Sequence, residues 1–288
     1  MLLQFVFSGC TLGAAYILAA LGFSMIYNAS GVINLAQGEF IMIGGMSATA
    51  LSALGIALPM AIVAGVVIAA LIGAAVERLA IAPTRKADTT SIIIITISVS
   101  MVLRGLTEII LGKENHSLPP FSGDQPIDFQ GASILPQSLW VFALSAIIVV
   151  ALAFFFGKTR FGKSMLATSH NRLAAQLVGV DVRKVMMSSF ALSAAIGAVG
   201  GVALAPITTV AYDTGVMLGL KGFVAATLGG LGSGLGAVFG GLFLGLCEAF
   251  TAGYISSSYK DAVPFVLVFL VLTLRPQGIF GVKSADRV

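Results

Sequence analysis

The chain has 288 residues, of which 58% are hydrophobic and 10% are charged, and its formal net charge is +4. A soluble domain carries about 25% charged residues because its surface faces water, so this composition excludes a soluble globule of the same length. The basic residues are spread over short loops between apolar segments, where orientation in a membrane explains them, so the charge does not indicate nucleic-acid binding. We therefore expect a protein that crosses a membrane several times and contacts lipid.

The apolar segments are long and nearly continuous, which favours helices over the strands of a barrel. Barrel strands would show about 10 residues of alternating hydrophobicity, whereas residues 61–75 and 141–156 are apolar runs. A helix satisfies its own backbone polar groups, and each crossing takes about 20 residues. The sequence predicts an all-α, polytopic helical bundle of about seven to eight transmembrane helices in a single domain, residues 1–288.

Seven simple spans are predicted in chain order, with Asp88, Thr89 and Thr90 as N-cap candidates for the fourth. They are residues 5–27, 32–54, 58–76, 91–111, 138–156, 186–205 and 263–274. The glycine-rich stretch 219–250 stands apart from them and requires a separate argument.

Lys and Arg counts in the loops set the expected orientation, because cytoplasmic loops are richer in these residues. Loop 112–137 has Lys113 as its one basic residue, with three acidic residues, and is expected to be external. Loops 76–90 and 157–185 and the tail are expected to be cytoplasmic. Their basic residues are Arg78, Arg85, Lys86, Lys158, Arg160, Lys163, Arg172, Arg183, Lys184, Arg275, Lys283 and Arg287.

Parity then predicts that residues 219–250 form a re-entrant or broken helical hairpin. A single crossing there would leave the basic tail outside, so we expect residues 221–228 to enter, the glycines to break the helix, and residues 237–250 to return. Such backbone is tolerated at membrane depth where protein or a water-filled cavity covers it. The same count puts the N-terminus outside. Close packing or hinge motion is expected at five glycines: Gly229, Gly230, Gly232, Gly236 and Gly240.

Four polar side chains are candidates for a translocation pathway. Asn34, Gln37 and Glu39 open the otherwise apolar second span, and Glu248 lies within the last part of the hairpin. Ionisable groups inside a membrane are costly and tend to face a cavity or a partner. An equal alternative for Glu39 is simple exposure at the cytoplasmic interface, and Glu248 could reach the external one.

Arg104 and Glu108 lie four residues apart on one span, so we expect them to pair with each other and neutralise their charges. The sequence contains no metal cluster, catalytic triad or dinucleotide fingerprint, and neither a catalytic residue nor a cofactor is expected.

Residues 157–164 read GKTRFGKS, which matches the phosphate-loop pattern. That pattern requires a preceding strand and a following helix in a soluble domain, and here an apolar span precedes it, so interfacial basic residues are the favoured interpretation. Residues 163–179 favour instead a short amphipathic helix on the cytoplasmic face that ends at Gly179.

The chain resembles the permease subunits of branched-chain amino acid ABC importers, in particular the Liv-type H subunit. The resemblance rests on residues 31–39 (GVINLAQGE), on residues 172–202, and on the glycine pattern of residues 222–241 followed by LRPQGI at 274–279. In the second stretch Ala174, Ala175 and Gly179 are similar to the loop that couples permeases to their ATPases. Arg172 and Leu173 stand where many permeases have an acidic residue.

The resemblance implies a non-enzymatic transport subunit of the bacterial inner (plasma) membrane that works by alternating access. It implies a second related permease, two cytoplasmic ATPase subunits that hydrolyse the ATP, and a periplasmic solute-binding protein that docks on the external face. Branched-chain amino acids are the expected solute, with urea or short amides as alternatives. A stand-alone secondary transporter is a further alternative, in which Glu39, Glu108 and Glu248 would carry ion coupling.

Overall fold

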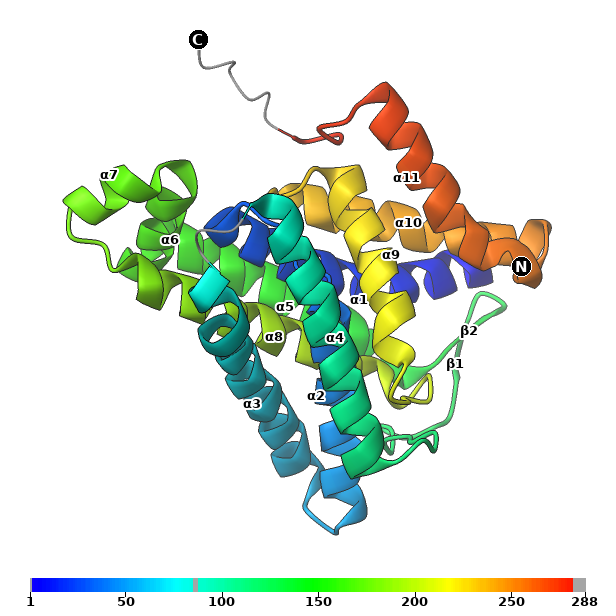
Figure 1. Cartoon of the computed structure of the whole chain (residues 1–288). Coiled ribbons are helices and arrows are strands. Elements are labelled where there is room, and N and C mark those ends of the chain that lie inside the picture. Colours follow the sequence, from blue (N-terminus) through cyan, green and yellow to red (C-terminus); the bar gives the residue numbers. More distant parts are fainter. Residues whose placement is uncertain (1, 85–87, 282–288) are drawn as a thin grey trace.

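A computed structural model describes residues 2–84 and 88–281 (Figure 1), so Arg85, Lys86, Lys283 and Arg287 lie outside the described residues. Helices dominate the described part, and the long loop before α5 carries a small hairpin of β1 (Ile127–Phe129) and β2 (Ala132–Ile134). The helices are α1 (Leu2–Ser30), α2 (Gln37–Ala53), α3 (Leu58–Val76), α4 (Thr89–Leu111), α5 (Pro136–Lys158), α6 (Arg160–His170), α7 (Arg172–Leu177), α8 (Val182–Leu204), α9 (Thr214–Gly229), α10 (Gly234–Tyr254) and α11 (Val263–Leu274).

Seven described helical segments are long and apolar enough to cross a membrane, which confirms the polytopic helical bundle. They are Leu2–Ser30, Leu58–Thr84, Thr89–Leu111, Pro136–Lys158, Val182–Leu204, Gly234–Tyr254 and Ser257–Leu274. With 17 and 16 residues, α2 and α9 are shorter. At about 1.5 Å per residue, neither helix reaches across the roughly 30 Å hydrocarbon core by itself.

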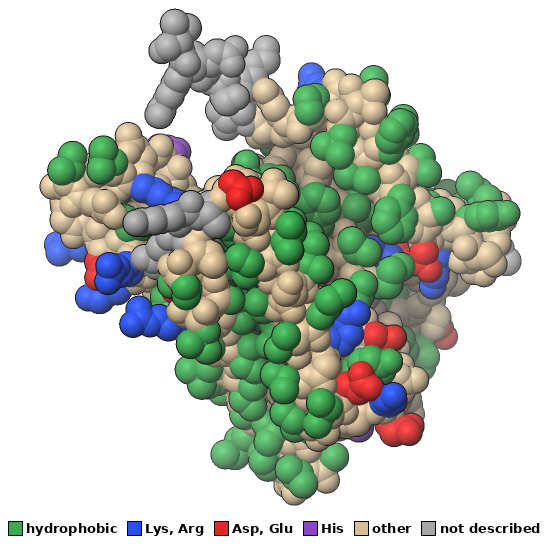
Figure 2. Space-filling model, in the orientation of Figure 1, with side chains coloured by type: hydrophobic (Ala, Val, Ile, Leu, Met, Phe, Trp, Pro, Cys, Tyr) green, Lys and Arg blue, Asp and Glu red, His purple; other side chains and the backbone are tan. Residues whose placement is uncertain are grey.

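Helices α1, α8 and the inner faces of α9 and α10 form the centre of the bundle, where Leu18, Ala20 and Leu244 are fully buried. By contrast, α3, α4, α5 and α11 expose many apolar side chains. Figure 2 shows green side chains spread over the face made by α3, α4 and α9, with Lys and Arg gathered at the left margin. The outer helices therefore present the surface expected of a protein dissolved in lipid.

The Asp88 N-cap prediction is confirmed. The Asp88 carboxylate accepts hydrogen bonds from the Ser91 hydroxyl at 2.6 Å and the Ser91 backbone N–H at 3.3 Å. These bonds, led by the hydroxyl, hold the pKa of the Asp88 carboxyl below its usual range because they stabilise the charged form.

The predicted hairpin is confirmed, but it runs from Thr214 to Tyr254 rather than from residue 219 to residue 250. The chain enters along α9 from Thr214, turns at residues 230–233, and returns along α10. Gly230 and Gly232 have φ values of +101° and +87°, a conformation that glycine adopts without strain, and they form the turn. Gly236 and Gly240 lie inside α10 instead, where they allow it to touch the backbone of α9.

The second span begins later than predicted, at Gln37 rather than at residue 32. Gly31 ends the first helix with φ +71°, and the Asn34 side chain accepts a hydrogen bond from the Ala36 N–H at 3.2 Å. These local features hold residues 31–36 in a non-helical path despite their apolar composition.

Two ends of the bundle can be distinguished by contacts between distant residues (Figure 1). At one end, Arg172 of α7 donates to the carbonyl of Ser30, and the Asn28 amide donates to the Gly232 carbonyl at 2.8 Å. We call this the basic end, because it carries residues 158–185. At the opposite end, the Gln4 amide bonds the backbone of Ser133 in β2, so the N-terminal helix starts beside loop 112–137.

Candidate translocation pathway and coupling segment

The start of α2 lies deep in the bundle, because the non-helical residues 31–36 lead the chain inward from the end of α1. Leu35 N–H donates to the Thr96 hydroxyl of α4 at 3.2 Å. Asn34 is 2% exposed, and its Nδ2 atom has no hydrogen-bond partner among the described residues. A buried polar segment at the head of a short helix is typical of the broken helices that form transporter sites.

Gln37 joins three helices at the centre of the bundle. Its Nε2 donates to the Ser193 carbonyl of α8 at 3.2 Å, and its Oε1 lies 2.6 Å from the Ser193 hydroxyl. The same hydroxyl lies 2.8 Å from the carbonyl oxygen of Gly22 in α1. Gln37 is fully buried, and its contacts together with those of Ser193 tie α1, α2 and α8 together at mid-bundle.

Glu39 is 1% exposed, so the expectation that it sits exposed at a membrane interface is wrong. Its Oε1 accepts hydrogen bonds from the Ser100 hydroxyl at 2.7 Å and from Arg104 Nη2 at 3.0 Å, both on α4. Arg104 therefore pairs with Glu39, and Glu108 pairs with Lys113 at 3.0 Å, so the predicted Arg104–Glu108 pair is also wrong. Thr96, Ser100 and Arg104 recur every four residues, which turns all three toward α2.

Glu248 lies in a second buried charged cluster. Its carboxylate accepts hydrogen bonds from the Tyr16 hydroxyl at 2.7 Å and from Lys221 Nζ at 2.5 Å. Lys221 also bonds Asp261 at 2.7 Å. Glu248 is 2% exposed, so these partners hold its carboxylate inside the bundle.

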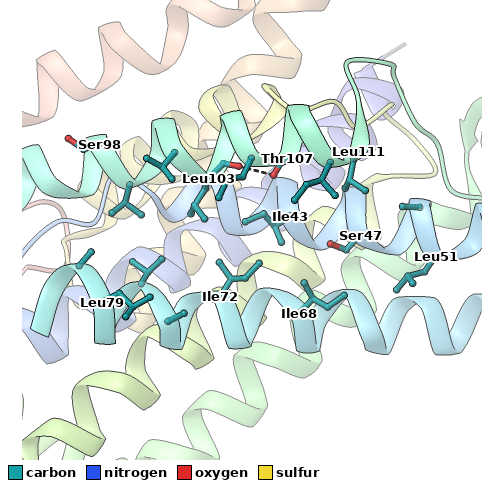
Figure 3. A pocket seen from close by; sticks show the side chains of 18 of the residues that line it. Ile43, Ser47, Leu51, Ile68, Ile72, Leu79, Ser98, Leu103, Thr107 and Leu111 are labelled. Atoms are coloured by element: carbon teal, nitrogen blue, oxygen red, sulfur yellow. Dashed lines mark hydrogen bonds between the residues drawn. The ribbon is translucent and has the colours of Figure 1, made fainter.

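A long apolar groove of about 760 Å³ runs between α3 and α4, with α2 behind it in the view of Figure 3. Ile68, Ile72 and Leu103 point into it. Two hydroxyls that reach it are bonded within their own helix: Ser98 donates to the Ile94 carbonyl at 3.0 Å and Thr107 to the Leu103 carbonyl at 2.8 Å. The groove suits hydrocarbon and offers poor recognition of a polar solute.

The predicted amphipathic helix of residues 163–179 is divided in two, α6 and α7. Asn171 separates them because its side chain caps α7 by accepting from the Ala174 N–H at 3.0 Å. Arg172 donates to the carbonyls of Ala29 and Ser30, at the C-terminal end of α1. Ala174 is exposed and Ala175 is 3% exposed, and Gly179 ends the segment with φ +88°.

The outer surface of this segment is unexpectedly apolar. Leu173, Leu177 and Val178 are 69%, 80% and 78% exposed. They lie on the basic end rather than on the lipid-facing helices, and exposed apolar clusters outside the membrane commonly mark protein contact sites.

The sequence matches the family model of the branched-chain amino acid transport system permease component over residues 5–272. The chain belongs to this family. LivH of Escherichia coli K12, named a high-affinity branched-chain amino acid transport system permease protein, is 35% identical over 99% of the permease and 97% of its own length. BraD of Pseudomonas aeruginosa is 31% identical over 99% and 98%.

A solved structure also resembles the permease. PsaBC from Streptococcus pneumoniae in complex with Fab gives a TM-score of 0.53 at 15% identity, covering 96% of the permease and 93% of that chain. This similarity shows the fold. The permease is accordingly a multi-pass membrane protein and a transport subunit of an ABC system rather than an enzyme, and its relatives are permeases of bacterial inner membranes.

Among the residues of the buried clusters, reasoning from sequence missed Tyr16, Ser100, Ser193 and Lys221. A usable signal existed for Lys221, the one basic residue in the glycine-rich stretch 219–250, because an intramembrane Lys requires an acidic partner. Tyr16 and Ser100 carry no such signal. The phosphate-loop pattern at residues 157–164 lacks the preceding strand that a nucleotide site requires, because α5 runs into it and α6 begins at Arg160.

Proposed function

We propose that the permease is the membrane-spanning subunit of an ATP-driven, binding-protein-dependent importer for branched-chain amino acids. The observation that carries this proposal is the end-to-end similarity to LivH and BraD, whose names state that solute class. The buried polar start of α2 supports it, because a polar solute needs hydrogen-bonding groups at membrane depth.

In this proposal the machinery contains a second related permease, two cytoplasmic ATPase subunits and a periplasmic solute-binding protein. The solute-binding protein docks at the end that carries loop 112–137 and releases solute between the two permeases. Asn34, Gln37, Glu39 and Glu248 belong to or border the pathway. Residues 157–185 face the cytoplasm, and the single permease domain comprises residues 1–288.

The ATPase contact is assigned to α7 and its flanks, residues 172–179. The exposed Leu173, Leu177 and Val178 offer the apolar anchor for an ATPase groove. Arg172 bonds the last carbonyls of α1, so movement of α7 would be transmitted to the central helix of the bundle. Gly179 allows the chain to leave α7 in a left-handed conformation.

Transport by reconstituted vesicles tests the solute and the energy source. The four kinds of subunit would be purified together, placed in proteoliposomes and supplied with ATP inside. Uptake of labelled leucine, competed by isoleucine and valine but not by urea or acetamide, is the expected result. Uptake of urea instead would move the permease to the alternative solute class, and ATP-independent uptake by the permease alone would indicate a secondary transporter.

Co-purification tests the coupling segment. Replacing Leu173 and Leu177 together with Ser should release the ATPases from the complex, whereas Leu54→Ser, which removes an equally exposed leucine from the opposite end, should not. Arg172→Gln should retain the ATPases and lower solute-stimulated ATP hydrolysis. ATPases that stay bound to the Leu173/Leu177 variant would place the contact elsewhere.

A further inference from the structure

The ion pair between Glu39 and Arg104 leaves one acceptor and one donor unused. Glu39 Oε2 and Arg104 Nε are both buried and have no hydrogen-bond partner among the described residues. Glu39 itself is 1% exposed. A charged atom that is buried without a partner is costly and therefore calls for an explanation by structure or function.

The unused Glu39 oxygen lies beside the start of α9. A Cβ atom built on Gly215 would come within 2.9 Å of Glu39 Oε2, so this oxygen faces the first turn of that helix. Two residues earlier, Asp213 precedes α9 without forming a side-chain cap, and its side chain is exposed. Glu39, Arg104 and Asp213 thus bring two carboxylates and one guanidinium to the junction of α2, α4 and α9.

Arg104 and Asp213 bring this junction to the surface of the chain, while its two unused atoms are covered. Arg104 is 31% exposed at its side chain and lies within the span Thr89–Leu111. Charged groups that face hydrocarbon are disfavoured, and in membrane proteins they turn toward water-filled cavities or partners. The face between α4 and the start of α9 is therefore suited to a solute path rather than to lipid.

We propose that Glu39, Arg104 and Asp213 bind the zwitterionic head of an α-amino acid. Its ammonium group would donate to Glu39 Oε2 and to the Asp213 carboxylate, and its carboxylate would accept from Arg104 Nε and Nη. Charge-assisted pairs of this kind are the strong ones, and Arg can bind a carboxylate with two donors. Ile97 and Met101, seven and three residues before Arg104, share its face of α4 and offer apolar contact for an aliphatic side chain.

The site deepens the proposed function and rests on it, since a zwitterion must be the transported solute. It also separates the two solute classes, because urea and short amides lack both charges. A solely structural ion pair would give no preference between solutes that differ in head-group charge.

Equilibrium binding tests the site without interference from the solute-binding protein. The permease pair with its ATPases would be purified without that protein, and labelled leucine binding measured with leucinamide and 4-methylpentanoate as competitors. Leucinamide lacks the carboxylate and 4-methylpentanoate lacks the ammonium. We expect wild type to prefer leucine to each analogue by about tenfold or more, the discrimination that charged hydrogen bonds provide.

Each variant should lose the preference for leucine over one of the two analogues. Arg104→Gln should weaken leucine binding about tenfold and bind leucine and leucinamide alike, and Glu39→Gln and Asp213→Asn should reduce the preference over 4-methylpentanoate. Glu108→Gln, which removes the neighbouring ion pair on α4, should bind as wild type does. Co-purified ATPases and a wild-type elution profile in gel filtration would show that the variants fold.

Two results would overturn the site: variants that bind leucine and its analogues as wild type does, or a wild-type complex that imports leucine in vesicles yet shows no preference among the three compounds. Failure of the vesicles to import leucine would instead refute the proposed function, so the two failures are distinguishable.

Discussion

At the scale of single residues, the cluster of Tyr16, Lys221, Glu248 and Asp261 shows how this bundle tolerates charge at membrane depth. Lys221 bonds both carboxylates, one on α10 and one just before α11. Its Nζ also lies 5.8 Å from the ring centroid of Tyr16. The cluster takes side chains from α1, α9 and α10 and from the turn just before α11. It therefore fixes the position of α11, a helix that exposes most of its surface.

Removing Lys221 should therefore be strongly destabilising. Lys221→Met leaves Glu248 buried beside Asp261 without a cation, and a broken buried pair costs about 3–5 kcal/mol. The measurement is equilibrium unfolding in mild detergent. Lys221→Met combined with Glu248→Gln should recover much of the loss, because the second change removes the unpaired buried charge.

Lys113→Met is the matched control, since it breaks the exposed pair with Glu108. Exposed pairs contribute little to stability, so this variant should unfold as wild type does. Equal losses for Lys113→Met and Lys221→Met would contradict the assignment of the Lys221 cluster as a buried support.

Residue types were readable from sequence, but their partners were not. Asn34, Gln37, Glu39 and Glu248 stand out as polar groups in apolar spans. Their spacing predicted an ion pair between Arg104 and Glu108, yet in the fold Arg104 pairs with Glu39, 65 positions away. Local spacing ranks neighbours on one helix and carries no information about which helix packs alongside.

At the scale of elements, the crossing of α9 and α10 depends on the absence of side chains. A Cβ atom on Gly236 would lie 2.4 Å from the Gly229 carbonyl oxygen, and one on Gly240 would lie 2.0 Å from the carbonyl oxygen of Ala225. Backbone-to-backbone contact of this kind is how small residues drive helix association in membranes.

Gly240→Ala should accordingly separate the two helices and lower stability by about 1–3 kcal/mol, the cost of overpacking a close contact. Gly234→Ala is the control from the same helix, because nothing lies within 4 Å of a Cβ there. It should be neutral. Thermal unfolding in detergent compares the two variants. An unchanged stability for Gly240→Ala would mean that α9 and α10 can move apart without loss of stability.

Span positions followed from apolar runs, whereas the start of α2 did not. Residues 58–76 and the end of the fourth span at residue 111 agree with the structure. Residues 32–36 looked helical because three of them are aliphatic, but Gly31 and the Asn34 side chain hold them out of the helix. Hydropathy reports where a segment resides and does not report its backbone conformation.

At the scale of the whole molecule, the glycine-rich hairpin determines where both ends of the chain lie. Because α9 and α10 traverse the bundle in opposite directions, residues 275–281 return to the basic end, where Phe280 N–H donates to the Gly229 carbonyl at 2.9 Å. The N-terminal helix starts at the opposite end, beside β2. The Lys and Arg counts of the loops and the number of membrane crossings predicted this arrangement, because neither depends on how the helices pack.

The arrangement predicts which positions share a side of the membrane. In a background with Cys10 and Cys247 replaced by Ala, single cysteines would be placed at Asp124 in the loop before β1, at Ser258 before α11 and at Gln176 on α7, all of which are exposed. Positions 124 and 258 should react with a membrane-impermeant thiol reagent in intact cells. Position 176 should react after permeabilisation, because the positive-inside rule puts the basic end in the cytoplasm.

The pattern of labelling separates fold from orientation. Phe5 contacts Tyr254 at a ring distance of 5.4 Å and Gln4 bonds Ser133, so positions 124 and 258 must lie on one side whichever way the bundle is inserted. Labelling that put these two positions on opposite sides would contradict the hairpin of α9 and α10. Labelling of position 176 alone in intact cells would keep the fold, invert its orientation, and remove α7 from reach of a cytoplasmic ATPase.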